Sequence, residues 1–137
     1  MTLEKRDKMR NVDTLKNIEI IDYFGQNKVQ LKSKESFPFV NYPNGTPCHI
    51  GNLYLLNLEE KNRSIHSIKQ YASNINYLIS FCYKIKLDFL KLTEGIFMDF
   101  TYDLRQESDS NNPLKRIRNS NTLNNIIRTN LDFLNFI

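Results

Sequence analysis

The chain has 137 residues, of which 40% are hydrophobic and 25% charged, and its formal net charge is +4. This length fits one domain, or one domain with an appendage, and the apolar content allows a packed core. There is no run of about 18 apolar residues and no apolar stretch after the charged N-terminus, so we expect neither a membrane-spanning helix nor a secretory signal. Cys48 and Cys82 are far apart in apolar surroundings, which indicates reduced, partly buried thiols in a cytoplasmic protein.

Residues 1–14 are polar and charged, and two short strands are expected after them, over 15–24 and 28–32. In both stretches aliphatic residues alternate with polar ones, the pattern of a half-buried strand. Gly25-Gln26-Asn27 supplies the turn between them. We therefore expect an N-terminal appendage with a β-hairpin over residues 1–36, and a helix over 13–24 is the alternative. A proline-rich extended linker is expected over 37–47.

Residues 48–137 are expected to be helical, because glycine and proline become rare and apolar residues recur every three or four positions. Four helices are predicted, over 49–60, 64–86 and 93–106, with the last beginning at 119–120. Ser64 and Thr93 are the expected caps of the second and third helices. The apolar stripe of the last helix is still running at Ile137, so we expect the chain to be part of a longer protein. The alternative is a C-terminal helix docked on its own core.

Basic and acidic residues are separated along the chain. Two stretches without acids, 61–87 and 110–131, carry lysines and arginines, whereas six acids lie between them, from Asp88 to Asp109. The second and fourth helices are thus basic and the third is acidic. If the two basic helices share a face, that face suits a polyanion such as double-stranded DNA. Ordinary solvated faces are the alternative.

Hydroxyl and amide side chains gather at the starts of these two basic helices. Free backbone N–H groups at a helix N-terminus suit phosphate contacts, and Asn, Ser and Thr side chains reach base edges. Simple capping explains Ser64 and Ser120 equally well. The predicted DNA contacts are Arg63, Ser64, His66, Ser67, Lys69, Lys115, Arg116, Arg118, Asn121, Thr122, Asn125 and Arg128.

Catalytic and metal-binding motifs are missing from the sequence. Neither of the two histidines, His49 and His66, lies at metal-ligand spacing from a cysteine, and no HExxH, CxxC or Gly-rich phosphate loop occurs. The carboxylates between Glu94 and Glu107 are better explained as a solvated helix face than as a metal site. The tyrosines are expected to pack. We therefore expect no cofactor, no metal and no small-molecule substrate.

Two motifs resemble the core-binding domain of tyrosine recombinases, the phage-type integrases. Ser64-x-x-Ser67-Ile68-x-x-Tyr71, followed by apolar positions to Phe81, resembles the Ser-x-x-Thr-Ile-x-x-Tyr that commonly begins this domain. Asn121-Thr122-Leu123-Asn124-x-Ile126, with Phe133-Leu134-x-Phe136, resembles its last helix. The likeness covers about residues 37–137, and the order of the motifs is more specific than any one of them.

The resemblance implies a SAM-like four-helix bundle over 48–137 that forms half of a clamp on recombination-site DNA. In the family a catalytic domain forms the other half, and its catalytic residues would lie after Ile137, so none is carried over and this chain alone is not expected to cut DNA. The parent protein would be a site-specific recombinase acting with other protomers in DNA integration or recombination. Ser67 stands where Thr is usual, and the basic loop 107–118 is long.

Two further interpretations remain open. The N-terminal hairpin either binds DNA, as N-terminal appendages do in the family, or only packs on the helices. The alternative to DNA binding is a helical protein–protein interaction module, which docks through the acidic third helix or the end of the fourth.

Overall fold

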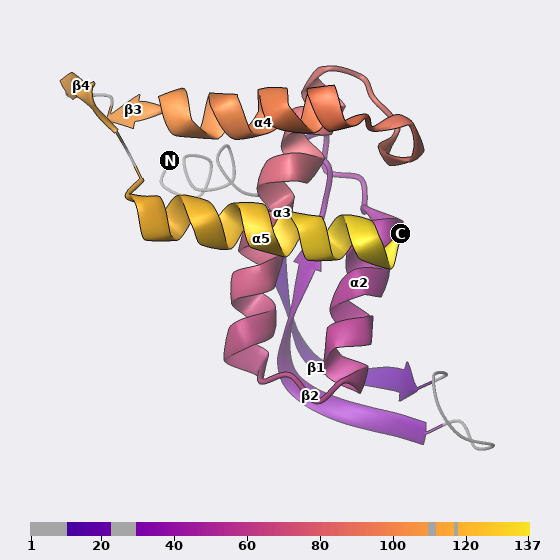
Figure 1. The fold of residues 1–137 in the computed structure, drawn as a ribbon. Coiled ribbons are helices and arrows are strands. Elements are labelled where there is room, and N and C mark those ends of the chain that lie inside the picture. The colour runs from indigo at the N-terminus through magenta and orange to yellow at the C-terminus, as the bar shows by residue number, and fades with distance from the viewer. Residues whose placement is uncertain (1–10, 23–29, 110–111, 117) are drawn as a thin grey trace.

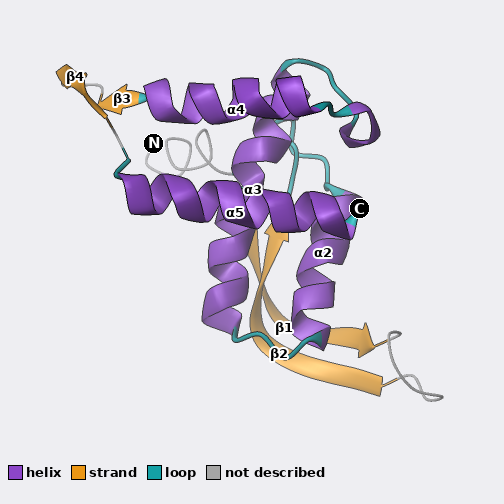
Figure 2. Ribbon diagram, viewed as in Figure 1, coloured by secondary structure: helices purple, strands orange, loops and turns teal. Residues whose placement is uncertain are grey.

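A computed structural model of the chain describes residues 11–22, 30–109, 112–116 and 118–137, without the side chains of 19–22, 30–35, 108–109 and 112–116. The described part is mainly helical, with an antiparallel hairpin on its N-terminal side (Figure 1). The hairpin consists of β1 (Val12–Asp22) and β2 (Gln30–Val40), and the helices are α2 (His49–Glu60), α3 (Ile65–Lys84), α4 (Glu94–Gln106) and α5 (Ser120–Phe136). A short 3₁₀ turn, η1 (Phe89–Lys91), and two small strands, β3 (Ser108–Asp109) and β4 (Asn112–Arg116), complete it (Figure 2).

The helix boundaries follow from side chains that cap the first turns. The backbone N–H of Ser67 donates to the Ser64 hydroxyl at the start of α3, and that of Ile96 donates to the Thr93 hydroxyl at the start of α4. Both predicted caps are confirmed. Asn119, rather than Ser120, caps α5, because its side-chain oxygen accepts from the Thr122 N–H at 2.9 Å. Each cap satisfies a backbone donor that has no partner inside the helix.

The hairpin is longer than expected. β1 and β2 pair in antiparallel register from Val12 opposite Val40 to Asp22 opposite Gln30, which excludes the alternative helix over 13–24. β2 runs on to Val40, so the expected linker begins with strand residues. The expected turn at 25–27, the start of the expected second strand at 28–29 and residues 1–10 lie outside the described residues.

The hairpin and the helices share one hydrophobic core. Phe37 and Val40 of β2 are buried together with apolar residues of α2, α3, α4 and α5. The Asn52 side chain on α2 accepts from the Val40 N–H at 2.8 Å and donates to the Val40 carbonyl at 3.1 Å. At Gly51 an added Cβ would lie 2.7 Å from the Val40 side chain, so only glycine lets α2 approach β2 this closely.

Helix α3 is the centre of this core. Ile68, Ala72, Ile75, Ile79 and Cys82 repeat every three or four residues along it and are fully buried. One face of α3 therefore packs against the hairpin and α2, as the apolar stripe predicted.

The segment 107–118, expected to be a long basic loop, contains the β3–β4 pair. Within the described residues, no helix combines the length and the apolar character needed to cross a membrane.

Candidate nucleic-acid interface

Helices α3 and α5 cross in direct contact. In Figure 1, α5 lies across the middle of α3 and over α2. At the crossing, the Asn74 amide donates to the Thr129 hydroxyl at 3.1 Å, and the Asn130 amide donates to the Asn74 carbonyl at 3.0 Å. Asn74 and Asn130 are both buried. The two helices that carry most of the predicted DNA contacts are therefore in contact. Because they cross at an angle, the surface beside the crossing forms a corner.

On α3, Asn74 marks the side of the helix that faces α5. Ser67 lies seven residues earlier, which is within about 20° of the same side, and it is half-buried. Arg63, just before the helix, is exposed, and its positive charge acts to lower the pKa of Tyr54 on α2. Ser67 thus lies on the α5-facing side of α3, and Arg63 precedes the helix, within electrostatic reach of Tyr54 on α2.

Lys69 and His66 lie elsewhere on α3. Lys69 is five residues from Asn74, which rotates it by about 140° away from the α5-facing side, and His66 is rotated by about 80°. Both side chains are exposed. The basic residues of α3 therefore do not form a single surface with those of α5.

On α5, exposed amide side chains follow the stripe that leads into the crossing. Asn121 and Asn125 are four residues apart, and the Asn125 carbonyl accepts from the Thr129 hydroxyl at 2.8 Å. Arg128 is exposed beside this stripe, and Thr122 is exposed in the first turn. These four predicted residues are thus accessible together on one helix.

One carboxylate shares the α5 stripe. Asp132 lies seven residues after Asn125, so the two residues are on nearly the same side of the helix. Its carboxylate accepts a 2.6 Å hydrogen bond from the Tyr54 hydroxyl, and Asp132 itself is exposed. A negative charge therefore stands at the edge of the corner.

Arg118 does not fit the predicted phosphate contact. Its side chain is 6% exposed, its Nη1 lies 3.0 Å from Glu107 Oε1, and its guanidinium stacks 4.7 Å above the centroid of the Tyr77 ring. It also donates to the Leu104 carbonyl. Burial acts to lower the pKa of Arg118, but hydrogen bonds with Glu107 and Tyr77 outweigh it and the pKa is raised. Arg118 therefore has a structural role, because its contacts hold the segment before α5 against α4.

The remaining predicted contacts are Lys115, Arg116 and Ser64. Lys115 and Arg116 belong to β4, and their side chains lie outside the described part of the structure. Ser64 is exposed, but its hydroxyl already serves as the α3 cap and also bonds the Ser67 hydroxyl at 3.0 Å.

The acidic helix α4 shows no metal site. Glu94, Asp99 and Asp103 are exposed, whereas Glu107 is paired with Arg118. Across the described residues, no group of three or more His, Cys, Asp or Glu side chains is arranged to hold a metal ion.

The sequence interpretation missed the polar residues that join the two helices. Asn74 bonds both Thr129 and the Gln70 side chain, and Asn130 is completely buried with one amide oxygen unpaired. The available signal was an amide within the apolar stripe of each helix, since such a residue is seldom buried without partners.

The comparisons with known proteins give no relative. No family model, no curated protein and no solved structure matches the chain.

Proposed function

We propose that the chain binds double-stranded DNA through the corner between α3 and α5, called here the corner surface and formed by Arg63, Ser67, Asn121, Asn125 and Arg128. In this proposal Arg63 and Arg128 contact phosphates on the two sides of the corner. The amides of α5 and the hydroxyl of Ser67 approach the groove between them. Phosphate contacts supply most of the affinity, and the polar side chains orient the duplex.

One observation supports the proposal: α3 and α5 are in direct contact, and an exposed arginine stands just before α3, at Arg63, and on α5, at Arg128. The exposed carboxylates Glu94, Asp99 and Asp103 stand on a different helix, α4. The N-terminal turns of α3 and α5 also add backbone donors.

A salt titration tests this interface. Affinity for a duplex is measured by fluorescence anisotropy at several salt concentrations, for the parent chain and for Arg63→Ala and Arg128→Ala. Each lost phosphate contact should reduce the slope of log affinity against log salt by about 0.9. Both variants replace exposed side chains, so folding is expected to be unaffected.

Two matched controls separate the corner surface from general positive charge. Lys69→Ala removes an exposed charge from the same helix but from the side turned away from α5, and Arg105→Ala removes one from α4. Neither should change the salt slope. If all four variants lower the slope equally, binding is non-specific charge attraction and the corner surface is wrong.

We further propose that the chain is a SAM-like core-binding domain of a tyrosine recombinase. The support is the order of the Ser64–Tyr71 and Asn121–Phe136 motifs, which fall on the two helices that meet at the corner. The coding sequence beyond Ile137 tests this. A continuation with an Arg…His-x-x-Arg…Tyr series is expected, and a stop codon directly after Ile137 would contradict it.

A protein–protein interaction module is the second candidate. Met98 and Tyr102, one turn apart on the acidic helix α4, are 57% and 61% exposed, and so place two large side chains next to each other on its surface. Unchanged duplex affinity in the corner variants, together with a stop codon after Ile137, would favour this candidate.

A further inference from the structure

A cavity of about 650 Å³ lies between α3 and α4, apart from the corner surface. Four aromatic residues line it: Tyr77, Phe81 and Tyr83 on α3 and Phe100 on α4. The rings of Phe81 and Phe100 pack edge to face with their centroids 5.4 Å apart, and this contact connects α3 to α4. The volume and this lining fit an apolar or aromatic group the size of a small ligand.

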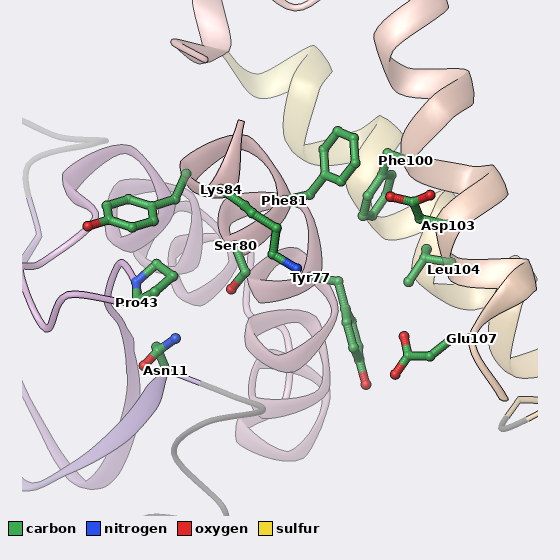
Figure 3. Close-up of a pocket in the computed structure, with 11 residues that line it drawn as sticks. Asn11, Pro43, Tyr77, Ser80, Phe81, Lys84, Phe100, Asp103, Leu104 and Glu107 are labelled. Carbon is green, nitrogen blue, oxygen red and sulfur yellow. The ribbon is translucent and has the colours of Figure 1, made fainter. Parts of the chain in front are cut away.

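Opposite charges reach the cavity from its two walls. In Figure 3, the Lys84 side chain extends from α3 toward α4, and the carboxylates of Asp103 and Glu107 extend from α4 toward α3. Glu107 is already paired with Arg118. Among the described residues, Lys84 and Asp103 form no ion pair with each other or with a third side chain.

We propose that this cavity binds an apolar group that carries one cationic and one anionic substituent. The apolar group lies against Tyr77 and Phe81, the cation pairs with Asp103, and the anion pairs with Lys84. A ligand with a single charge would pair with one of these two residues but would be repelled by the other, which carries a charge of the same sign as the ligand. The arrangement therefore selects a dipolar ligand, and it is independent of the proposed DNA binding.

Two sources supply this chemistry: a free aromatic amino acid, or a peptide segment with a basic and an acidic residue beside an aromatic one. An NMR titration of the full chain with four probes distinguishes them. The dipolar probes are L-phenylalanine and acetyl-Lys-Phe-Glu-amide. The uncharged controls are acetyl-phenylalanine amide and acetyl-Gln-Phe-Gln-amide.

At least one dipolar probe should give saturable chemical-shift changes at the backbone amides of Phe81 and Phe100. Its uncharged control should give weaker changes. Saturation by phenylalanine assigns a free small molecule, and saturation by the tripeptide alone assigns a peptide segment. If no probe saturates, or if the uncharged control binds as well as its dipolar partner, the proposal is wrong.

Charge variants test the two pairings separately. Lys84→Gln and Asp103→Asn should each weaken binding of the dipolar probe by about three- to fivefold, because both side chains are exposed. The uncharged probes should be unaffected. Lys91→Gln and Asp99→Asn, exposed residues outside the cavity, are the matched controls and should bind as the parent does. Equal affinity in Lys84→Gln, Asp103→Asn and the controls would overturn the assigned pairings.

Discussion

The hydroxyl of Tyr54 donates a 2.6 Å hydrogen bond to the carboxylate of Asp132, and so links the buried side of α2 to an exposed turn of α5. Tyr54 is 1% exposed, and its ring also packs against Phe133, with centroids 5.2 Å apart. The bond fixes the end of α5 over α2. It also holds a carboxylate at the edge of the corner surface, where that charge opposes a polyanion.

Asp132→Asn should therefore tighten binding to a DNA duplex. The amide oxygen still accepts from the Tyr54 hydroxyl, but the negative charge is gone, and we expect affinity to rise by about two- to fivefold at low salt. The gain should shrink as salt is added. Asp99→Asn on α4 is the control and should leave the affinity unchanged. Weaker binding by Asp132→Asn, with folding intact, would argue against a duplex in the corner.

Stability should fall in alkaline solution because two tyrosines have raised pKa values. Burial and then the bond to Asp132 raise the pKa of Tyr54, and burial and then the bond to Cys48 raise that of Tyr42 to about 12. Below about pH 10 both rings stay protonated in the folded and unfolded chains. Above it the unfolded chain loses these protons first, so unfolding is favoured by about 1.4 kcal/mol per pH unit for each tyrosine.

Urea unfolding between pH 8 and 11 measures this effect. Tyr54→Phe should lower stability at pH 8, because the hydrogen bond is lost, and should also flatten the alkaline decline. Tyr102→Phe, at a 61% exposed position, is the control and should follow the parent curve. A parallel decline in the Tyr54→Phe variant would show that Tyr54 does not contribute to it.

Arg118→Ala should destabilise the fold rather than remove a phosphate contact. The substitution leaves Glu107 without its partner, exposes the Tyr77 ring and frees the Leu104 carbonyl, and we expect a loss of about 2 kcal/mol, since Glu107 is partly solvated. Arg128→Ala, an exposed arginine, should change stability by less than about 0.5 kcal/mol. Chemical denaturation gives both values, and equal losses would mean that the Arg118 contacts contribute nothing.

Gly51→Ala should be costly, whereas Gly95→Ala should not. At Gly51 the new methyl group would lie 2.7 Å from the Val40 side chain and 3.1 Å from that of Ile79, so α2 must move away from β2, at about 1–3 kcal/mol. At Gly95 the nearest atom, the Thr93 hydroxyl, is 3.9 Å away, and alanine should stabilise the first turn of α4 by up to about 1 kcal/mol. Thermal unfolding should give shifts of opposite sign.

The thiols of Cys48 and Cys82 should react slowly in the folded chain. Both are buried and free, and burial raises the pKa of Cys48 and, with the nearby Cys48, raises that of Cys82 to about 11. Little thiolate is therefore present at neutral pH, and access is blocked. Labelling with a chromogenic disulfide should take place at the rate of unfolding and become fast in urea. Rapid labelling of either thiol under native conditions would contradict the buried placement.

The helices were predictable from the sequence because their signals are local. Apolar residues three or four apart placed α2, α3 and α4 within about two residues of their observed ends. The hydroxyls of Ser64 and Thr93 also marked the starts of α3 and α4. The role of Arg118 was not predictable, because its partners Tyr77 and Glu107 come from other elements and a basic segment gives no sign of burial. The same holds for β2, whose last residues contain a proline and gain their stability from contacts with α2 and α3.

For the candidate site, the sequence identified which helices are polar and basic, but not which sides of them meet. Lys69 and Ser67 are two residues apart, yet only Ser67 borders the corner surface, and that difference depends on where α5 crosses α3. The crossing itself depends on Asn74 and Asn130, whose amides look like surface residues until their partners are known.

The anchoring of Val40 by Asn52 has a consequence for where this protein can be divided. A truncated chain that starts at residue 48 keeps α2, α3, α4 and α5 but loses Phe37 and Val40 from the core, and Gly51 loses the Val40 side chain beside it. The smallest fragment that folds independently should therefore include β1 and β2. Expression trials that begin at α2 should yield insoluble material even though they retain α2, α3, α4 and α5.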